Sequence, residues 1–253
     1  MVERVSESGT RAAEEETLKA RDVRVHFEGV KALDGVDLDL ARDEIVGLIG
    51  PNGAGKTTLV NVLSGFQRPS EGTVRLSGID TTDWNPARLA SAGLTRTFQN
   101  ARLFHNLTVF ENVEAGAVGV GCRRGEARRR AAEMLERFHL HSRASVLAGS
   151  LAHGDERRLG IARAFATQPR FLLLDEPAAG LNEQESDELV RVLTAIREDF
   201  PVGVLVIEHD MRVIMRFCER IQVLDYGRTI AIGRPDEIRE NPAVLDAYLG
   251  AEE

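Results

Sequence analysis

The stretch Gly50–Thr58, GPNGAGKTT, decides how the rest of the sequence is interpreted. It matches the pattern GxxxxGK[ST] at every position. The apolar run Ile45–Ile49 precedes it without alternation, which is typical of a buried parallel strand, and a helix is expected from Lys56 to Leu63. A buried strand, a glycine-rich turn and a helix in this order predict an anion site built from backbone N–H groups and a helix N-terminus.

The side chains of this loop predict a nucleoside triphosphate as the anion. Lys56 would reach the β- and γ-phosphates, and the hydroxyl of Thr57 would bind Mg²⁺. Lysine occurs at only three positions of the chain, so a chance occurrence at position 56 is hard to accept. The residues expected to bind ATP here are Asn52, Gly53, Ala54, Gly55, Lys56, Thr57 and Thr58. The alternative is a glycine turn that opens a helix and binds no ligand.

Two carboxylates and a histidine follow later buried strands. Asp175 and Glu176 come directly after the apolar run 171–174, and parallel strands bring their carboxyl ends to the crevice where ligands bind. Asp175 is expected to face the metal beside Thr57, and Glu176 to orient or deprotonate the attacking water. An acid after an apolar strand can also simply cap a turn. His209 ends the strand 202–207, and its position alone fits a γ-phosphate contact and a packed histidine equally well.

Length, charge and cysteine content narrow the class of protein. The 253 residues suffice for one large domain or two coupled lobes, and the net charge of −8 argues against a general nucleic-acid binder. Cys122 and Cys218 have no paired spacing, so two buried, reduced thiols are expected. No apolar run approaches the roughly 18 residues that span a bilayer, so a partner would supply any membrane part. The polar start, Met1–Glu16, is expected to be a disordered tail.

The middle of the chain differs in character from the rest. Residues 36–40 alternate apolar and acidic side chains like a half-exposed antiparallel strand, whereas residues 100 to about 163 are predicted to be a mostly helical lobe inserted into an α/β core. Thr108 and Glu111 have the spacing of a helix-capping box. Several arginines between 123 and 130 suggest a nucleic-acid patch, but no aromatic residues interleave with them, which favours a solvated helix face.

Together these features resemble the nucleotide-binding subunits of ABC transporters, from about Thr17 to Gly250. The resemblance implies an α/β fold: a P-loop NTPase (RecA-like) core with an antiparallel β subdomain and an inserted helical subdomain, as one ATPase domain over residues 17–253. It implies that Phe27 stacks on adenine, that Gln99 contacts Mg²⁺ and the attacking water, and that His209 is the switch histidine. The catalytic set is then Glu176, His209, Gln99 and Lys56, and the metal set Thr57, Gln99 and Asp175.

The same resemblance implies a dimer with two ATP molecules between its subunits. Each subunit would present a signature segment, here Leu151, Ala152, His153, Gly154 and Asp155, to the phosphate loop of the other. This segment departs from the common Leu-Ser-Gly-Gly-Gln, and Asn182 stands where an aspartate is usual. Losing one hydrogen bond to a charged group is worth about 1.5–3 kcal/mol. The departures therefore bear on the rate of hydrolysis more than on ATP binding.

Four segments, 96–104, 175–182, 207–211 and 241–250, resemble the ATPases of high-affinity branched-chain amino-acid importers. Relatives in that subfamily often carry a Leu-Ala-x-Gly signature, so this resemblance implies that Ala152 is a usual residue at its position. The implied partners are a second ABC ATPase, identical or distinct, transmembrane permease subunits and, indirectly, a solute-binding protein, with no nucleic acid. The implied location is peripheral, on the cytoplasmic face of the cell membrane, and cytosolic when isolated.

Other functions remain open at this point. The ATPase of a urea, amide or lipopolysaccharide-export system would have a very similar sequence. A soluble ABC ATPase that acts on ribosomes or DNA is a further alternative, as is an ATP-binding regulatory subunit without turnover, given Ala152, Asp155 and Asn182. A small-molecule kinase or GTPase shares the phosphate loop but does not explain Gln99, the signature segment and His209 together.

Overall fold

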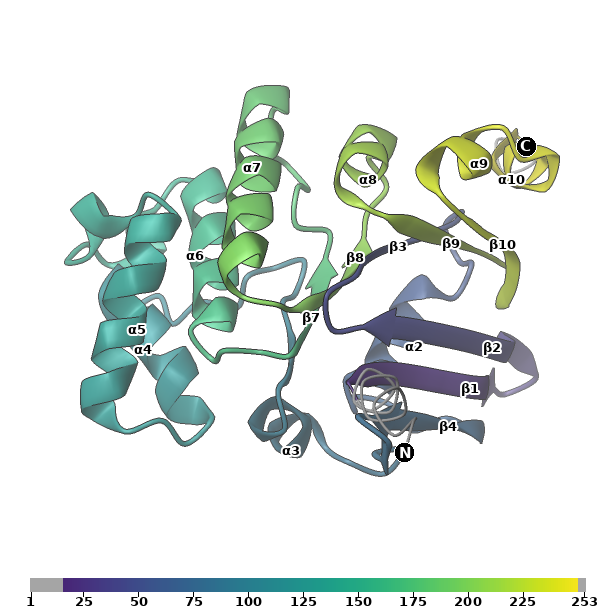
Figure 1. The fold of residues 1–253 in the computed structure, drawn as a ribbon, viewed down its shortest axis with the longest axis horizontal. Helices are drawn as coiled ribbons and strands as arrows, with labels where there is room; N and C mark the ends of the chain where they lie inside the picture. Colours follow the sequence, from purple (N-terminus) through teal and green to yellow (C-terminus); the bar gives the residue numbers. More distant parts are fainter. Residues whose placement is uncertain (1–15, 250–253) are drawn as a thin grey trace, which may run out of the picture.

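Two β-sheets organise the part of the chain that the structure, a computed structural model, describes, which is residues 16–249 (Figure 1). The first is antiparallel, in the order β2 (Val30–Ala41), β1 (Thr17–Phe27), β4 (Glu71–Leu76), β5 (Ile79–Asp80). The second has the order β10 (Arg228–Gly233), β9 (Arg220–Asp225), β3 (Ile45–Ile49), β8 (Gly203–Ile207), β7 (Phe171–Asp175), β6 (Leu94–Arg96). It is parallel from β9 to β6, and β10 pairs antiparallel with β9.

Strand β3 lies at the centre of the molecule and carries the phosphate loop at its carboxyl end. All five of its residues are buried, which confirms the predicted buried parallel strand. Val46 and Leu48 belong to the core shared with the antiparallel sheet, whereas Ile45 and Ile49 belong to the core on the opposite face. Two hydrophobic cores therefore hold the strand from both sides, so the loop that follows it starts from a fixed position.

The antiparallel sheet follows from an alternation of apolar and acidic residues in its strand β2. In β2, Val36, Leu38 and Leu40 are buried while Asp37 and Asp39 are exposed, as the sequence pattern predicts. One face of the strand thus joins the core and the other faces solvent.

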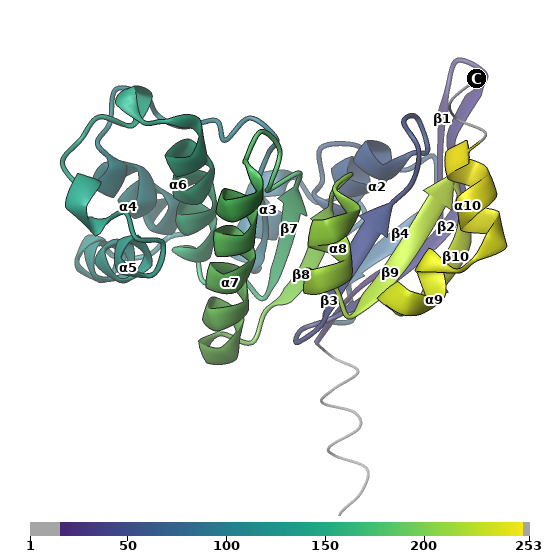
Figure 2. The same cartoon turned by 90° about the horizontal axis from the view of Figure 1, so that it is seen from above.

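The helices cover the parallel sheet and form a separate group at one end. Their bounds are α2 Lys56–Leu63, α3 Pro86–Ser91, α4 Val109–Gly119, α5 Arg124–Arg137, α6 His153–Phe165, α7 Glu183–Asp199, α8 Met211–Phe217, α9 Pro235–Arg239 and α10 Pro242–Leu249, with short 3-10 turns η1 His141–Arg143 and η2 Ala148–Ser150. Figures 1 and 2 both place α4 and α5 at the end of the molecule opposite to α9 and α10. We retain the division into an α/β core and an inserted helical subdomain, about 100–163, as a proposal.

The helical region forms for the local reasons that its sequence indicates. Thr108 Oγ1 accepts from the Glu111 N–H at 3.1 Å, and Glu111 Oε2 accepts from the Thr108 N–H at 2.8 Å, which confirms the capping box. Helix α5 buries Ala127, Ala131, Met134 and Leu135 in the core, while arginines on its other face pair with glutamates of the same helix. That pairing fits a solvated face.

Several details differ from the sequence-based expectations or lie beyond them. Helices α3 and α9 were not predicted. Each has only five or six residues, too few to show a helical pattern of apolar residues, and each begins at a proline. Cys218 is buried as expected, but Cys122 is only partly buried. Burial raises the pKa of the Cys218 thiol to about 12. Of the predicted tail, residues 1–15 lie outside the described residues. No helix within residues 16–249 is long and apolar enough to cross a membrane.

Candidate active site

The phosphate loop joins β3 to α2 with a backbone in which three glycines, Gly50, Gly53 and Gly55, have positive φ angles, and at two of them a Cβ atom would also clash. Gly50 and Gly55 have φ angles of 149° and 101°. A Cβ atom at Gly50 would lie 2.0 Å from the carbonyl oxygen of Leu224, and one at Gly55 would lie 2.6 Å from that of Ala32. The loop is therefore pressed against neighbouring strands on one side. At Gly53 a Cβ would meet nothing within 4 Å, so the backbone there faces open space.

The start of α2 suits a phosphate group. The helix begins at Lys56 directly after Gly55, which provides no side-chain cap, so the first-turn N–H groups are left for an external acceptor. Lys56 Nζ donates to the carbonyl oxygens of Gly50 and Pro51 at 2.7 and 2.9 Å. Burial lowers the pKa of Lys56, and the charge of Glu176 opposes that shift. A polyphosphate beside this partly buried ammonium would stabilise its charged form.

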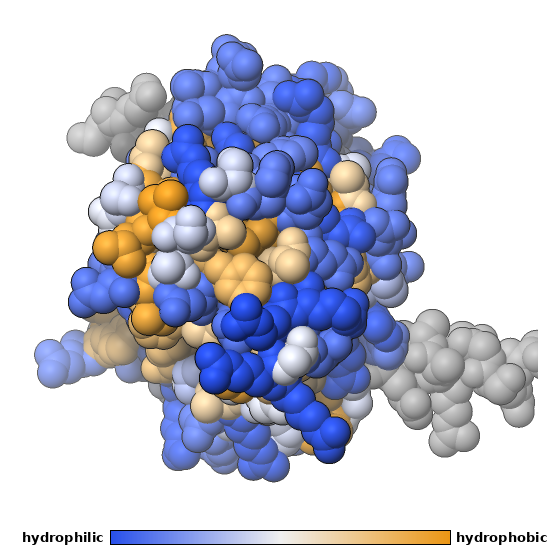
Figure 3. Space-filling view, turned by 90° about the vertical axis from the view of Figure 1, so that its left-hand side faces the viewer, coloured by the Kyte–Doolittle hydropathy of each residue, from blue (hydrophilic) through white to orange (hydrophobic). Residues whose placement is uncertain are grey.

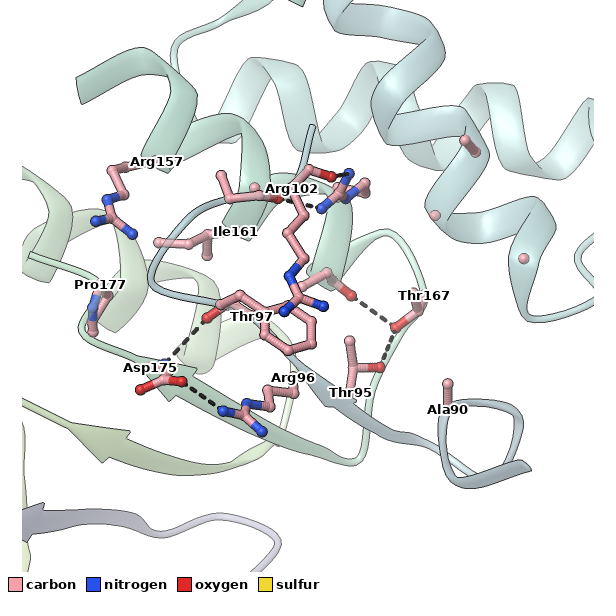
Figure 4. Close-up of a pocket in the computed structure, with 18 of the residues that line it drawn as sticks. Ala90, Thr95, Arg96, Thr97, Arg102, Arg157, Ile161, Thr167, Asp175 and Pro177 are labelled. Atoms are coloured by element: carbon pink, nitrogen blue, oxygen red, sulfur yellow. Dashed lines mark hydrogen bonds and ion pairs between the residues drawn. The ribbon is translucent and has the colours of Figure 1, made fainter. Parts of the chain in front are cut away.

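Asp175 lies at the end of β7 and is held by an arginine that the sequence did not single out. Arg96 Nη2 contacts Asp175 Oδ2 at 2.7 Å, and the two side chains are only 6% and 14% exposed (Figure 4). Arg96 also donates to Asn61 Oδ1 of α2 and to Oγ of Ser64, the C-cap of that helix, at 2.7 and 3.1 Å. Arg96 therefore ties the carboxylate end of β7 to the helix of the phosphate loop.

Glu176 and Gln99 meet directly, although 77 positions separate them in the chain. Gln99 Nε2 donates to Glu176 Oε2 at 2.6 Å. Glu176 has a φ of 48°, in the left-handed region, and its N–H donates to the carbonyl oxygen of Ile207 at 2.8 Å. The backbone thus turns sharply at the expected base, a kind of strain that is common at functional sites.

His209 lies on the surface next to a buried acid. Its side chain is 70% exposed, and Nδ1 is 3.6 Å from Glu208 Oε2. Glu208 is buried and accepts from the N–H groups of Ala178, His209 and Asp210, at 2.7, 3.1 and 3.4 Å. Burial raises the pKa of Glu208 despite these donors. Glu208 was not among the residues predicted from the sequence. Its place between the buried strand β8 and His209 is the signal that could have identified it.

Of the other residues expected to bind the nucleotide, some are exposed, whereas Ala54 is buried and Gly55 and Thr58 are partly buried. Phe27 ends β1 and is 49% exposed, and Asn52, Gly53 and Thr57 are also exposed. Within residues 16–249 there is no cluster of three or more His, Cys, Asp or Glu side chains that could hold a metal by itself. Mg²⁺ in proteins usually keeps waters and takes much of its coordination from substrate phosphates, so it needs few protein oxygens. The side-chain oxygens of Thr57, Gln99 and Asp175 are the proposed protein ligands for Mg²⁺.

The signature segment lies away from the phosphate loop of its own chain. It leads into α6, which both views separate from α2 (Figures 1 and 2). Ala152 is the N-cap of α6 and has no side-chain hydrogen bond. His153 Nε2 lies 3.3 Å from the carbonyl oxygen of Ala179, and Asp155 contacts Arg143. Gly154 is the second residue of α6, and a Cβ there would lie 3.1 Å from Glu185 Oε1 and 3.6 Å from Leu181 Cδ2.

A groove of about 340 Å³ opens between the parallel sheet and the helical region. Arg96, Thr97 and Asp175 lie on its sheet side, and Arg157 and Ile161 of α6 lie on the other (Figure 4). Figure 3 shows the face of the helical region, where apolar side chains gather within a charged surface. The exposed large apolar residues of that region are Phe104, Val118, Val146 and Leu147.

Arg157 is a second arginine that the sequence did not single out. Its side chain is buried, and its Nε has no hydrogen-bond partner within residues 16–249. Burial lowers its pKa, while the charges of Glu176, Glu208 and Asp175 oppose the shift. The guanidinium of Arg157 therefore interacts electrostatically with the carboxylates of the site.

Two family models match parts of this chain, and a curated relative matches most of it. Residues 33–179 match the ABC transporter family, and residues 228–253 match a family described as branched-chain amino acid ATP-binding cassette transporter. The high-affinity branched-chain amino acid transport ATP-binding protein BraF of Pseudomonas aeruginosa is 42% identical over 92% of this chain and 97% of its own.

Solved structures show the same fold. The ADP conformation of MJ1267, an ATP-binding cassette of an ABC transporter, has a TM-score of 0.84 at 29% identity and covers 93% of this chain and 99% of its own. The dimeric structure of MJ0796, a bacterial ABC transporter cassette, has a TM-score of 0.77 at 29% identity and covers 86% and 98%. The predicted fold class and the prediction of an ATPase are thereby confirmed. This chain belongs to the ATP-binding cassette family of ABC transporters.

Proposed function

We propose that this chain hydrolyses Mg-ATP between two cassettes and thereby drives import of branched-chain amino acids. The contact between Gln99 and Glu176, at 2.6 Å, is the observation that carries the catalytic part, because it joins the expected base to the residue expected beside the metal. The similarity to BraF and the match of residues 228–253 support the cargo.

Each catalytic side chain has a task that its position allows. The first-turn N–H groups of α2 and the Lys56 ammonium bind the phosphates and spread the negative charge that develops during transfer. Glu176, fixed by its backbone and by Gln99, orients the attacking water and accepts its proton. His209, exposed beside the buried Glu208, is placed to hydrogen-bond the γ-phosphate. A bound Mg²⁺ supplies charge neutralisation to the phosphate oxygens.

A second cassette completes the site. The signature segment leads into α6, which both views place apart from α2, the helix of the phosphate loop, and this separation supports a role toward another subunit. The dimeric MJ0796 cassette supports this arrangement. The second subunit is a copy of this chain or a distinct ATPase.

The groove receives the membrane partner. Phe98, the residue before Gln99, lines this concave groove, and the aromatic side chain of Phe104 on its wall is 53% exposed. Such a surface suits a short amphipathic helix of a permease subunit. Docking there would place the chain at the cytoplasmic face of the membrane.

The test is steady-state hydrolysis of Mg-ATP by the full chain, alone and with its candidate second ATPase. Glu176→Gln is expected to lower kcat at least about 100-fold while ATP binding persists, because general-base catalysis contributes about 100- to 10,000-fold. Glu133→Gln on α5, far from the loop, is the control and should match the unaltered chain. ATP binding without any turnover would favour a regulatory subunit instead. With permease and binding protein in proteoliposomes, leucine should stimulate turnover, and its failure to do so would refute the cargo.

A further inference from the structure

The signature segment carries a negative charge at the end of a helix that would have to receive phosphate. Asp155 lies in the first turn of α6, three residues after the N-cap Ala152. Helix N-termini attract anions through their unpaired N–H groups. A carboxylate fixed at the same end competes with an incoming phosphate and repels it at close range. The charge of Asp155 therefore needs compensation if α6 is to take part in ATP binding.

Arg143 provides that compensation from another element. Its guanidinium contacts Asp155 Oδ2, and the Asp155 side chain is only 14% exposed whereas that of Arg143 is 49% exposed. The carboxylate is thus largely covered, and the positive partner is the member of the pair that faces solvent. The second acid in this turn, Glu156, lies 3.8 Å from His153 Nδ1, and this contact is an ion pair only when the imidazole is protonated.

The position of Arg143 is fixed by the backbone around it. Arg143 ends the 3-10 turn η1, where its N–H donates to the carbonyl oxygen of Leu140 at 3.0 Å and its carbonyl accepts from Val146 at 2.9 Å. The next residue, Ala144, accepts from the N–H of Phe110 in α4 at 3.0 Å. Because this turn is fastened to α4, the guanidinium approaches Asp155 from a rigid support.

We propose that Arg143 is a positioning residue for the ATP bound by the second cassette: it neutralises Asp155 and keeps the end of α6 able to receive the γ-phosphate. The inference rests on the proposed function, in which the signature segment faces the phosphate loop of the other subunit. It predicts that the charge of Asp155, and not the contact as such, is what makes Arg143 necessary.

The experiment is steady-state hydrolysis by the full chain, with binding of a fluorescent ATP analogue measured separately at low chain concentration. Arg143→Gln is expected to lower turnover about tenfold, the scale of a helix-end charge, and to leave binding at the chain's own phosphate loop unchanged. Arg143→Lys should retain most of the turnover. Adding Asp155→Asn to Arg143→Gln should restore it. Arg137→Gln, which removes a pair with Asp199 in the same region, is the control.

The outcomes separate the possibilities. A double variant as slow as Arg143→Gln would mean that the pair acts as a mechanical clip, and this would overturn the proposal. Equal turnover in Arg143→Gln and the unaltered chain would overturn it as well, with the proposed function intact. No turnover by the unaltered chain, alone or with its second ATPase, would overturn both. Thermal melting of every variant shows whether a loss reflects unfolding, and a folded Arg143→Lys variant that is as slow as Arg143→Gln would also contradict the charge argument.

Discussion

Replacing Arg96 with methionine should destabilise the fold strongly, because it leaves the Asp175 carboxylate buried without its cation. The two side chains are 6% and 14% exposed, and Arg96 Nη2 lies 2.7 Å from Asp175 Oδ2. Arg96 also donates to Asn61 and Ser64, so its loss detaches α2 from the end of β7. Methionine keeps an unbranched apolar stem and has no donors, so the change tests the hydrogen bonds and the charge more than the packing.

The expected loss of stability in Arg96→Met follows from the burial of the Arg96–Asp175 pair. Removing one partner of a buried ion pair costs about 3–5 kcal/mol. For a chain of this length each kcal/mol lowers the melting temperature by about 2–4 °C, so the loss should be about 6–20 °C. Adding Asp175→Asn should recover a part of it, because the uncompensated charge disappears.

The assay is thermal and urea unfolding at pH 7, followed by circular dichroism. Arg68→Met is the matched control, since the Arg68–Asp83 pair at 3.5 Å is 77% and 76% exposed and should contribute about 0–1 kcal/mol. A loss below about 1 kcal/mol for Arg96→Met, equal to that of the control, would refute the view that this pair ties the active site to the core.

Two further predictions concern the phosphate loop and the cysteines. Gly50→Ala should abolish binding of a fluorescent ATP analogue, because the new Cβ would lie 2.0 Å from the carbonyl oxygen of Leu224. Gly53→Ala should be milder, because it meets only the strain of a φ of 82° and has no atom within 4 Å of the new Cβ; equal binding by both variants would contradict the packing argument. At pH 8 a thiol reagent should modify Cys122 in the folded protein and Cys218 only after denaturation, because burial raises the Cys218 pKa to about 12 and leaves about one thiolate in 10,000. Rapid modification of both thiols in the folded protein would show that Cys218 is accessible.

Features encoded locally could be predicted from the sequence. The strand–loop–helix unit from Ile45 to Leu63 has the bounds that its pattern indicates, because each part depends on neighbours within a few residues. The cap of α4 by Thr108 and the start of α7 after Asn182 are likewise local. The family resemblance then supplied the fold class, which the comparisons confirm.

Contacts between distant segments could not be predicted in the same way. The Arg96–Asp175 pair joins positions 79 apart, and Arg157 of α6 comes near Asp175 only because both line the same groove. Arginine is common in this chain, and no local pattern distinguishes these residues from arginines on solvated faces such as that of α5. Only the strand order β10-β9-β3-β8-β7-β6, a tertiary property, brings the groups together.

The altered residues of the signature region illustrate the same distinction and bear on activity. From the sequence alone, each departure from the usual signature residues, and the asparagine at position 182, is interpreted as the loss of an interaction with ATP. In the fold, Asp155 pairs with Arg143, His153 lies against the carbonyl of Ala179, and Asn182 forms a capping box with Glu185 at the start of α7. Each side chain thus has a partner within its own chain, and none of them disturbs the contact between Gln99 and Glu176. We therefore expect the substitutions to change how the second cassette approaches, and hence the rate of hydrolysis, while the chain's own phosphate loop binds ATP as before.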